Sequence, residues 1–388
     1  MKDHNFSQKE NVLLVGVIYG RLDDEKVHEH LDELSLLTET AGGNVISRVT
    51  QKISKINPSF FIGKGKAEEI IQYAKDLKIT SIIFDDELSP SHLKNYNNLS
   101  KEIKIIDRSM LILEIFKQHA QTKEAKTQVE LAELQYMLPR LTRAWTHLER
   151  QMGGIGTRAG AGETQIEVDR RLVRTRISKL KTDLKKIENE RELQRKRRGN
   201  FFKVTLVGYT NAGKSTLMKA MSGSNVFIQD QLFATLDTTT RLVELDNAHS
   251  IMLSDTVGFV RKLPHHLVAS FKSTLKEVVN SDLILMVLDS SSKQVYDHYK
   301  TIIDVLKDLG AERHKTLVTL NKVDHEDVEQ QITYLKRKFP KGIFVSALNQ
   351  LRINILSKEI IKLMDEMYQV VDLKFSYTDS KAIAQAQE

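Results

Sequence analysis

Residues 204–216 constrain the fold of this chain more than any other stretch. They read Val-Thr-Leu-Val-Gly-Tyr-Thr-Asn-Ala-Gly-Lys-Ser-Thr, so a strand-like apolar run leads into G-x-x-x-x-G-K-S and then into a helix-like run. A phosphate-binding loop requires this context, because its glycines let backbone N–H groups and the helix N-terminus face an anion. Lys214 supplies a charge for the terminal phosphates, and the Ser215 hydroxyl is placed to bind Mg²⁺. The flanking strand and helix argue against the alternative, a glycine turn without a ligand.

Composition restricts the class of protein. A chain of 388 residues that is 40% hydrophobic is long enough for two or three globular domains. The absence of cysteine excludes disulfides and thiolate metal sites and fits a reducing cytosol. The first ten residues lack the apolar core of a signal peptide, and no apolar run is long enough to cross a membrane. We therefore expect a cytoplasmic protein without a membrane span. We also expect a monomer.

The positive charge is concentrated in one segment. The formal net charge is +7, but residues 170–198 hold thirteen Lys or Arg against four Asp or Glu, an excess of nine. The rest of the chain therefore carries about −2, which is seven minus nine. Such a concentration favours a polyanionic partner for that segment, most plausibly nucleic acid.

The first 122 residues alternate between strand-like and helix-like patterns. Strands are predicted at 11–18, 45–49, 81–85 and 103–106, and helices at 26–40, 63–77, 91–99 and 110–119. This alternation predicts a small parallel α/β domain over residues 1–122. The turn Gly63-Lys64-Gly65-Lys66 could bind a phosphate, or it could be a plain turn with solvated lysines.

Residues 123–199 predict two long helices joined by a glycine-rich tip. The first helix covers 124–138 and is expected to bend at Pro139 and continue to 148, and the second covers 163–198. Between them, residues 152–162 contain five glycines and one arginine, Arg158. Two such helices form an antiparallel arm. The alternative is that the two helices are only a solvated spacer. However, the tip is too rich in glycine to hold a shape by itself, and the second helix is strongly basic. These features favour a tip that becomes ordered when it contacts a ligand.

The rest of the chain predicts a P-loop domain over residues 200–375 and a disordered tail at 376–388. Apolar runs after the P-loop predict further strands at 242–245, 251–254, 283–289, 317–320 and 342–345. We therefore expect an α/β protein with an N-terminal parallel α/β domain, a long antiparallel helical arm and a C-terminal P-loop domain whose sheet is mostly parallel.

Further motifs complete a phosphate site. Asp255 ends an apolar strand, where the carboxylate that holds Mg²⁺ in a P-loop protein belongs. Gly258 can bring its backbone N–H close to a terminal phosphate without a clashing side chain. The Thr-rich loop 233–241 offers either Thr235 or Thr239 as a further Mg²⁺ ligand.

The tetrapeptide Asn321-Lys322-Val323-Asp324 predicts which base the bound nucleotide carries. The Asp324 carboxylate can accept two parallel hydrogen bonds from guanine N1–H and the 2-amino group, and adenine offers no such pair. The backbone near Ala347 can donate to the guanine carbonyl oxygen. This tetrapeptide is common by itself, but after a P-loop and a D-x-x-G, each at a strand end, it predicts a guanine site.

In this order the motifs resemble those of translation-factor-type GTPases, and other stretches resemble the HflX family of bacterial GTPases across essentially the whole chain. These stretches are Gly42-Gly43, residues 61–66, Gly-Gly-Ile-Gly-Thr-Arg-Ala-Gly-Ala-Gly-Glu-Thr at 153–164, residues 233–237 and Asp-Thr-Val-Gly-Phe-Val-Arg-Lys-Leu-Pro at 255–264. The resemblance implies a GTPase that binds GTP and GDP and reaches ribosomal RNA of the large ribosomal subunit, with its tip near the peptidyl-transferase centre. It also implies that the protein splits stalled or idle ribosomes into subunits.

The motifs and the resemblance give the expected site. Lys214, Thr235 and Gly258 are the catalytic residues, and Mg²⁺ is held by Ser215 and Thr235 directly and by Asp255 through water. Thr235 is preferred over Thr239 because its twenty-residue separation from Ser215 resembles that in related GTPases. The nucleotide-binding residues are expected to be Gly208, Tyr209, Thr210, Asn211, Ala212, Gly213, Lys214, Ser215, Phe233, Ala234, Thr235, Leu236, Asp237, Asp255, Thr256, Val257, Gly258, Asn321, Lys322, Val323, Asp324, Ser346, Ala347 and Leu348. RNA contacts are expected at Arg158, Arg195, Lys196, Arg197 and Arg198.

Some positions depart from the family pattern. Thr238 stands where the family usually has proline, and residues 348–351 replace the usual Lys-Thr-Gly-x-Gly. Phe259 stands where many GTPases carry a water-orienting glutamine, which predicts slow unaided turnover. Asn211 resembles the asparagine that holds a potassium ion in some GTPases without that glutamine, so K⁺ is a second candidate cofactor.

Two other functions are compatible with the sequence. One is an RNA-remodelling ATPase or GTPase acting on ribosomal RNA, with the main work done in the N-terminal domain. Nucleotide competition on the isolated fragment 1–199 would separate it from the GTPase. The other is a ribosome-anchoring factor whose P-loop is merely structural, and slow but ribosome-stimulated turnover would argue against it.

Overall fold

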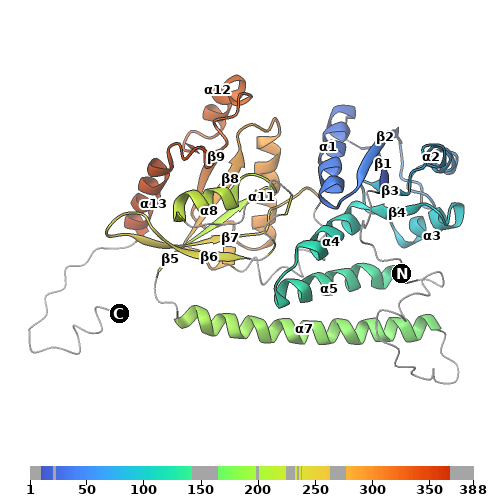
Figure 1. Ribbon diagram of the computed structural model, residues 1–388, viewed down its shortest axis with the longest axis horizontal. Helices are drawn as coiled ribbons and strands as arrows, with labels where there is room; N and C mark the ends of the chain where they lie inside the picture. The colour runs from blue at the N-terminus through green and yellow to red at the C-terminus, as the bar shows by residue number, and fades with distance from the viewer. Residues whose placement is uncertain are drawn as a thin grey trace, which may run out of the picture. The chain divides into compact units, whose positions relative to one another are not determined.

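Two compact units make up the protein (Figure 1). The computed structural model describes residues 10–20, 23–141, 165–197, 201–223, 232–233, 236, 238–262 and 277–367. The first unit takes in residues 1–185, 231–233 and 262–271, and the second takes in 186–230, 234–261 and 272–388. The finer division into parts at 1–122, 123–199, 200–375 and 376–388 stays a prediction.

The first unit is built on a four-stranded parallel sheet. Its strands are β1 (Asn11–Ile18), β2 (Asn44–Lys52), β3 (Ser81–Phe84) and β4 (Lys104–Asp107), in the order β2-β1-β3-β4. One helix follows each strand: α1 (Asp24–Thr40), α2 (Lys64–Asp76), α3 (Pro90–Leu99) and α4 (Arg108–His119). The predicted parallel α/β domain is confirmed. Helix α4 begins two residues earlier than expected because the Asp107 carboxylate accepts the N–H of Met110 and caps it.

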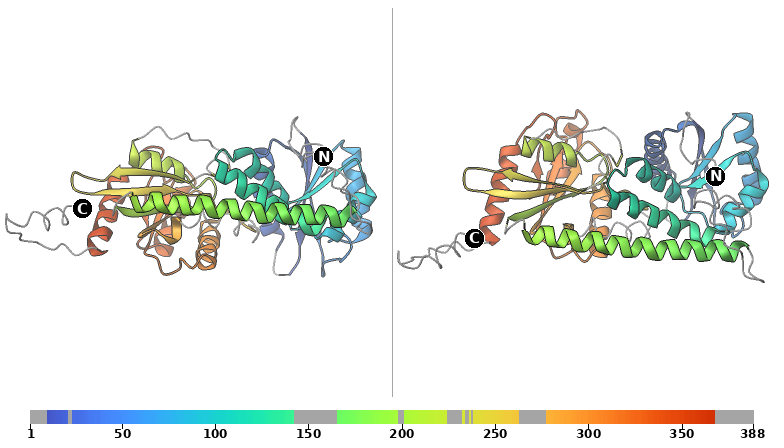
Figure 2. Two further views of the ribbon diagram at one scale, coloured as in Figure 1. Left: turned by 90° about the horizontal axis from the view of Figure 1, so that it is seen from below. Right: turned by 60° about the horizontal axis from the view of Figure 1, so that its bottom comes forward.

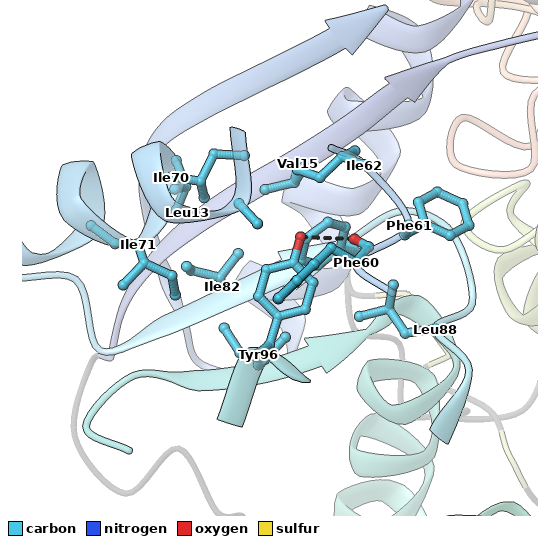
Figure 3. Close-up of a cluster of buried hydrophobic side chains, with 14 of the residues drawn as sticks. Leu13, Val15, Phe60, Phe61, Ile62, Ile70, Ile71, Ile82, Leu88 and Tyr96 are labelled. Atoms are coloured by element: carbon cyan, nitrogen blue, oxygen red, sulfur yellow. Dashed lines mark hydrogen bonds between the residues drawn. The ribbon is translucent and has the colours of Figure 1, made fainter. Parts of the chain in front are cut away.

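Apolar side chains from the sheet and from α2 and α3 form the core of this unit (Figure 3). Leu13 and Ile82 of the sheet pack in one buried cluster with Ile70 of α2. Tyr96 of α3 is fully buried in this cluster, and its hydroxyl donates to the Phe60 carbonyl at 3.0 Å. The one polar group of this side chain is therefore satisfied inside the core.

The two lysines of the turn before α2 have carboxylate partners. Gly63 precedes the helix without a side-chain cap. The ammonium groups of the two lysines pair with carboxylates on the same helix, Lys64 with Glu68 at 3.6 Å and Lys66 with Glu69 at 2.6 Å. These contacts favour the simple turn over a phosphate site.

Helices α5 (Lys123–Met137) and α7 (Gln165–Arg197) form the predicted pair of long helices (Figure 2). In the first unit, Arg176 donates to both carboxylate oxygens of Glu130, at 2.6 and 2.8 Å. Arg170 donates to the Leu141 carbonyl at 3.2 Å. Arg176, the later of the two arginines in α7, contacts Glu130 within α5, whereas the earlier Arg170 contacts Leu141 beyond the end of α5, so the two helices run antiparallel. The 33 residues of α7 span about 50 Å.

Helix α5 is interrupted just before Pro139, where a bend was expected. It ends at Met137, residues 138–140 form one 3₁₀ turn, and Leu141 is extended. Proline has no N–H for a helical hydrogen bond, and its ring clashes with the carbonyl four residues back, so a regular helix is disfavoured there. The expected continuation over 142–148 and the tip at 152–162 lie outside the described residues.

The second unit contains a six-stranded sheet in the order β10-β9-β8-β5-β7-β6. Its elements are β5 (Phe202–Gly208), α8 (Lys214–Ser222), β6 (Thr239–Glu244), β7 (Ser250–Asp255), β8 (Leu283–Asp289), α11 (Val295–Asp308), β9 (Thr316–Asn321), α12 (Val328–Lys338), β10 (Ile343–Phe344) and α13 (Ile353–Met367). Among the strands that the structure describes here, only the edge strand β6 is antiparallel to its neighbour, so the predicted mostly parallel sheet is confirmed. Across the described ranges, no helix is long and apolar enough to cross a membrane.

Candidate nucleotide-binding site

The predicted P-loop connects the inner strand β5 to helix α8. Two of its glycines leave no room for a side chain. A Cβ at Gly208 would lie 2.4 Å from the Val287 carbonyl oxygen, and one at Gly213 would lie 2.2 Å from Nδ2 of Asn321. Gly213 also has φ +87°, and Asn211 has φ +58°. The loop therefore has a backbone shape that requires glycine at positions 208 and 213.

Lys214 is buried in the loop. Its ammonium donates to the carbonyls of Gly208 at 3.2 Å and Tyr209 at 3.0 Å. Burial lowers the pKa of Lys214 to about 8, although the Asp255 carboxylate raises it in part. A phosphate next to this amine would favour the charged form, so nucleotide binding is expected to take up protons above that pH.

Two oxygen ligands that suit Mg²⁺ lie together at the start of α8. The hydroxyl of Ser215 donates to Oδ2 of Asp255 at 2.6 Å. Close by in the sequence, Oγ1 of Thr210 is buried and has no hydrogen-bond partner within the described part of the chain. A polar ligand in the loop would satisfy this oxygen. The chemistry of these residues fits a phosphate with a bound magnesium ion, whose ligands in proteins are oxygens.

Gly258 lies tightly against the loop. A Cβ there would be 2.8 Å from both Cα and Cγ2 of Thr210 and 3.1 Å from Nζ of Lys214. The next residue, Phe259, is 1% exposed. Its ring is directed into the interior, so it does not replace a water-orienting glutamine.

Gly258→Ala is expected to lower the rate of GTP hydrolysis by on the order of 10- to 100-fold, because the new methyl group displaces the segment from the loop. Single-turnover hydrolysis measures the effect. Gly65→Ala is the matched control, because a Cβ at Gly65 has no atom within 4 Å. If both variants hydrolyse GTP at the rate of the unsubstituted protein, close packing at Gly258 has no part in the reaction.

Asn321 connects three predicted segments of the site. Its Nδ2 donates to the Ala212 carbonyl of the P-loop at 3.0 Å, and its Oδ1 accepts the N–H of Ala347 at 2.9 Å. Ser346 is fully buried beside Ala347, and the N–H of Val323 donates to the Val345 carbonyl at 3.3 Å. The P-loop and the two segments predicted to bind the base thus form one structure.

The other residues predicted to bind the base have partners that the sequence did not indicate. Nζ of Lys322 lies 2.8 Å from Oδ2 of Asp289, and Asp324 accepts from Nδ2 of Asn349 at 3.2 Å. Asp289 ends a predicted strand, a signal that could have identified it. Asn349 lies in the stretch that departs from the family pattern and offered no such signal. Leu348 is 76% exposed.

Several predicted nucleotide residues have side chains that are turned into the protein. Ala212, Thr256 and Val257 are buried, and the Thr256 hydroxyl donates to the Leu206 carbonyl at 2.7 Å. If these residues bind nucleotide, they do so through their backbones.

The Thr-rich loop is described only in part. In the first unit, the ring of Phe233 is buried edge-on against Phe116, with centroids 4.7 Å apart. Thr239 begins β6 opposite Asp255. Leu236 is buried, and Ala234, Thr235 and Asp237 lie outside the described residues. The choice of Thr235 over Thr239 as a Mg²⁺ ligand stays a prediction.

The expected RNA contacts also stay predictions. Residues 195–197 lie in the last turn of α7, and their side chains are not among those described. Arg158 and Arg198 lie outside the described residues.

Family models match three consecutive parts of the chain. They are described as the GTP-binding GTPase N-terminal region over residues 28–117, the GTP-binding GTPase middle region over 119–198 and the 50S ribosome-binding GTPase over 203–322. Together they include strands β2 to β4 of the first unit and the P-loop of the second.

Curated relatives match most of the chain. GTPase HflX of Flavobacterium psychrophilum is 51% identical over 315 residues, which cover 81% of this chain and 76% of the relative. GTPase HflX of Escherichia coli is 42% identical over 341 residues, which cover 87% and 79% respectively. Among solved structures, the crystal structure of the SsGBP–GDP complex is 27% identical, with a TM-score of 0.50 and coverage of 93% of this chain and 99% of that one.

Proposed function

This chain belongs to the HflX family of GTPases and hydrolyses GTP, and from that premise we propose that GTP controls its binding to the large ribosomal subunit. The observation that carries the proposal is the connection of the P-loop to Asn321 and Ala347 within one unit. Such a site can distinguish guanine nucleotides from adenine nucleotides. In this proposal the backbone of Gly258, which packs against the P-loop, distinguishes GTP from GDP by the terminal phosphate. The match of residues 203–322 to a 50S ribosome-binding GTPase model supports the choice of partner.

We further propose that the bound protein splits stalled or idle ribosomes into subunits. The antiparallel helices α5 and α7 support this proposal, because they carry the glycine-rich segment 152–162 at their connection. A rigid pair of helices can place that segment in an RNA cleft while the basic residues of α7 contact phosphates. A protein with these partners would act in the cytoplasm, and we propose that it does so as a monomer.

The oxygen groups of Ser215 and Asp255 fit Mg²⁺, which prefers oxygen ligands. When bound, it neutralises the charge that develops on the phosphates. In this proposal Ser215 and Thr235 hold it, with Asp255 acting through water, and Lys214 adds a second positive charge. A role for K⁺ beside Asn211 is a separate proposal.

Turnover is expected to be slow without a partner, because Phe259 is buried and cannot orient water. GTP hydrolysis by the full chain, measured with and without purified large subunits, tests the proposed function. Stimulation by the subunits of at least about 10-fold is expected, since completing such a site raises rates strongly. Equal rates would contradict the proposed control by the ribosome, and equal rates in Na⁺ and K⁺ would contradict a role for K⁺.

Replacing Arg195, Lys196, Arg197 and Arg198 by alanine is expected to weaken ribosome binding and to flatten its dependence on salt. Removing one cation from a phosphate lowers the slope of log affinity against log salt by about one. Co-sedimentation across a salt series measures that slope. The matched control replaces Lys336, Arg337 and Lys338, three exposed basic residues at the end of α12, and should leave the slope unchanged. Equal slopes for the two variants would exclude a specific role for the basic end of α7.

A further inference from the structure

The side chain of Tyr209 connects the P-loop to the segment that follows Gly258. Tyr209 is 5% exposed, and its hydroxyl oxygen accepts the backbone N–H of Arg261 at 2.7 Å. The ring stacks on the imidazole of His298 in α11, with centroids 3.9 Å apart and planes 13° apart. The phenol therefore has one fixed orientation, set by the stack, in which it holds Arg261.

The same two segments are also joined by their backbones. The N–H of Thr210 donates to the Phe259 carbonyl at 2.8 Å, and the N–H of Phe259 donates to the Gly208 carbonyl at 3.0 Å. These bonds form a short parallel bridge between Tyr209 and Phe259. The bridge fixes Phe259, and the Tyr209 hydroxyl fixes Arg261, two positions further on.

Gly258 lies one residue before Phe259 and three residues before Arg261. Its position matters for hydrolysis because its N–H is expected to face the terminal phosphate, which GTP has and GDP lacks. Phe259 is turned into the interior, so the reaction depends on where the backbone lies rather than on a water-orienting side chain at that position. A small shift in backbone position is enough to slow a reaction strongly.

We propose that Tyr209 is a positioning residue for GTP hydrolysis, whose hydroxyl holds the backbone of Arg261 and so keeps Gly258 against the P-loop. In this role the phenol does not touch the nucleotide. It acts on the segment after Asp255, and the stack on His298 keeps the hydroxyl in place. This role is separate from any contact that the Tyr209 backbone makes with phosphate.

Tyr209→Phe tests the proposal, because it removes only the hydroxyl and keeps the ring. The loss of one hydrogen bond predicts a fall in kcat of about 3- to 10-fold. KM and the Kd for GDP should stay within about 2-fold, since the P-loop itself is unchanged. Amide hydrogen exchange in the peptide that contains Arg261 should become faster. The split between kcat and KM, together with the local exchange, separates positioning from a general loss of structure.

Two further variants complete the test. Tyr299→Phe removes a phenol hydroxyl from the same helix that carries His298, where the ring packs on Phe339 with centroids 5.3 Å apart, and should change neither kcat nor exchange. His298→Ala removes the stacking partner of the Tyr209 ring and should reproduce the fall in kcat. The double variant with Tyr209→Phe should have a kcat no lower than that of the more severe single variant. An unchanged kcat in Tyr209→Phe, or parallel losses in kcat, KM and GDP affinity, would overturn the proposal.

Discussion

Asp324→Asn is expected to lower the affinity for GTP by on the order of 100-fold or more and to raise the affinity for xanthosine triphosphate. The Asp324 carboxylate can accept from both N1–H and the 2-amino group of guanine. In asparagine an NH₂ donor replaces one of the two acceptor oxygens. This donor suits the 2-oxo group of xanthine. Titration with fluorescent GTP and xanthosine nucleotides measures both changes.

Asp327→Asn provides the control for this experiment. Asp327 is also an exposed carboxylate of the second unit and lies three residues further along, where it pairs with His325 at 3.4 Å. This variant should bind GTP normally. If Asp324→Asn also binds GTP normally, the structure recognises the base in some other way, and the assignment of the guanine site is wrong.

Replacing residues 153–162 by a Gly-Ser linker is expected to abolish ribosome splitting while GTP binding and much of the ribosome binding remain. In our proposal, phosphate contacts along α7 contribute most of the affinity for the ribosome. The tip acts only after docking, because contacts that position a protein on RNA are separable from contacts that act on a specific site. Splitting is read by light scattering, and binding is read by co-sedimentation in parallel.

The control is a replacement of equal length at a different place in the chain. Residues 376–385, replaced by the same linker, should leave splitting unchanged. If the protein without its tip splits ribosomes at the rate of the unsubstituted protein, the two helices are only a spacer, and the proposed role of the tip is wrong.

Much of the fold could be predicted from the sequence because its signals are local. Alternating apolar runs identified the strands of both sheets, and the order of elements predicted their parallel arrangement. The P-loop, Asp255 and residues 321–324 each lie at the end of a strand in the structure, as the motifs require. Glycine at 208 and 213 is explained by steric contacts that the motif already implied.

Other features depend on packing that sequence spacing does not reveal. Whether Pro139 bends or ends a helix depends on the conformation of the residues after it, and the structure shows an ended helix. The pairing of Lys322 with Asp289 joins the ends of two strands that are separated in the sequence by a helix. The contact from the Tyr209 hydroxyl to Arg261 spans 52 positions and involves a backbone N–H, which no side-chain pattern indicates.

Co-sedimentation of the full chain with purified large ribosomal subunits tests the central claim most directly. The chain is added without nucleotide, with GDP or with a non-hydrolysable GTP analogue. Coupling between nucleotide and ribosome predicts binding at least about 10-fold tighter with the GTP analogue than with GDP. In Asp324→Asn, the corresponding xanthosine analogue should restore binding that the GTP analogue no longer supports. Binding that is equal in all nucleotide states, or absent from all of them, would contradict the account.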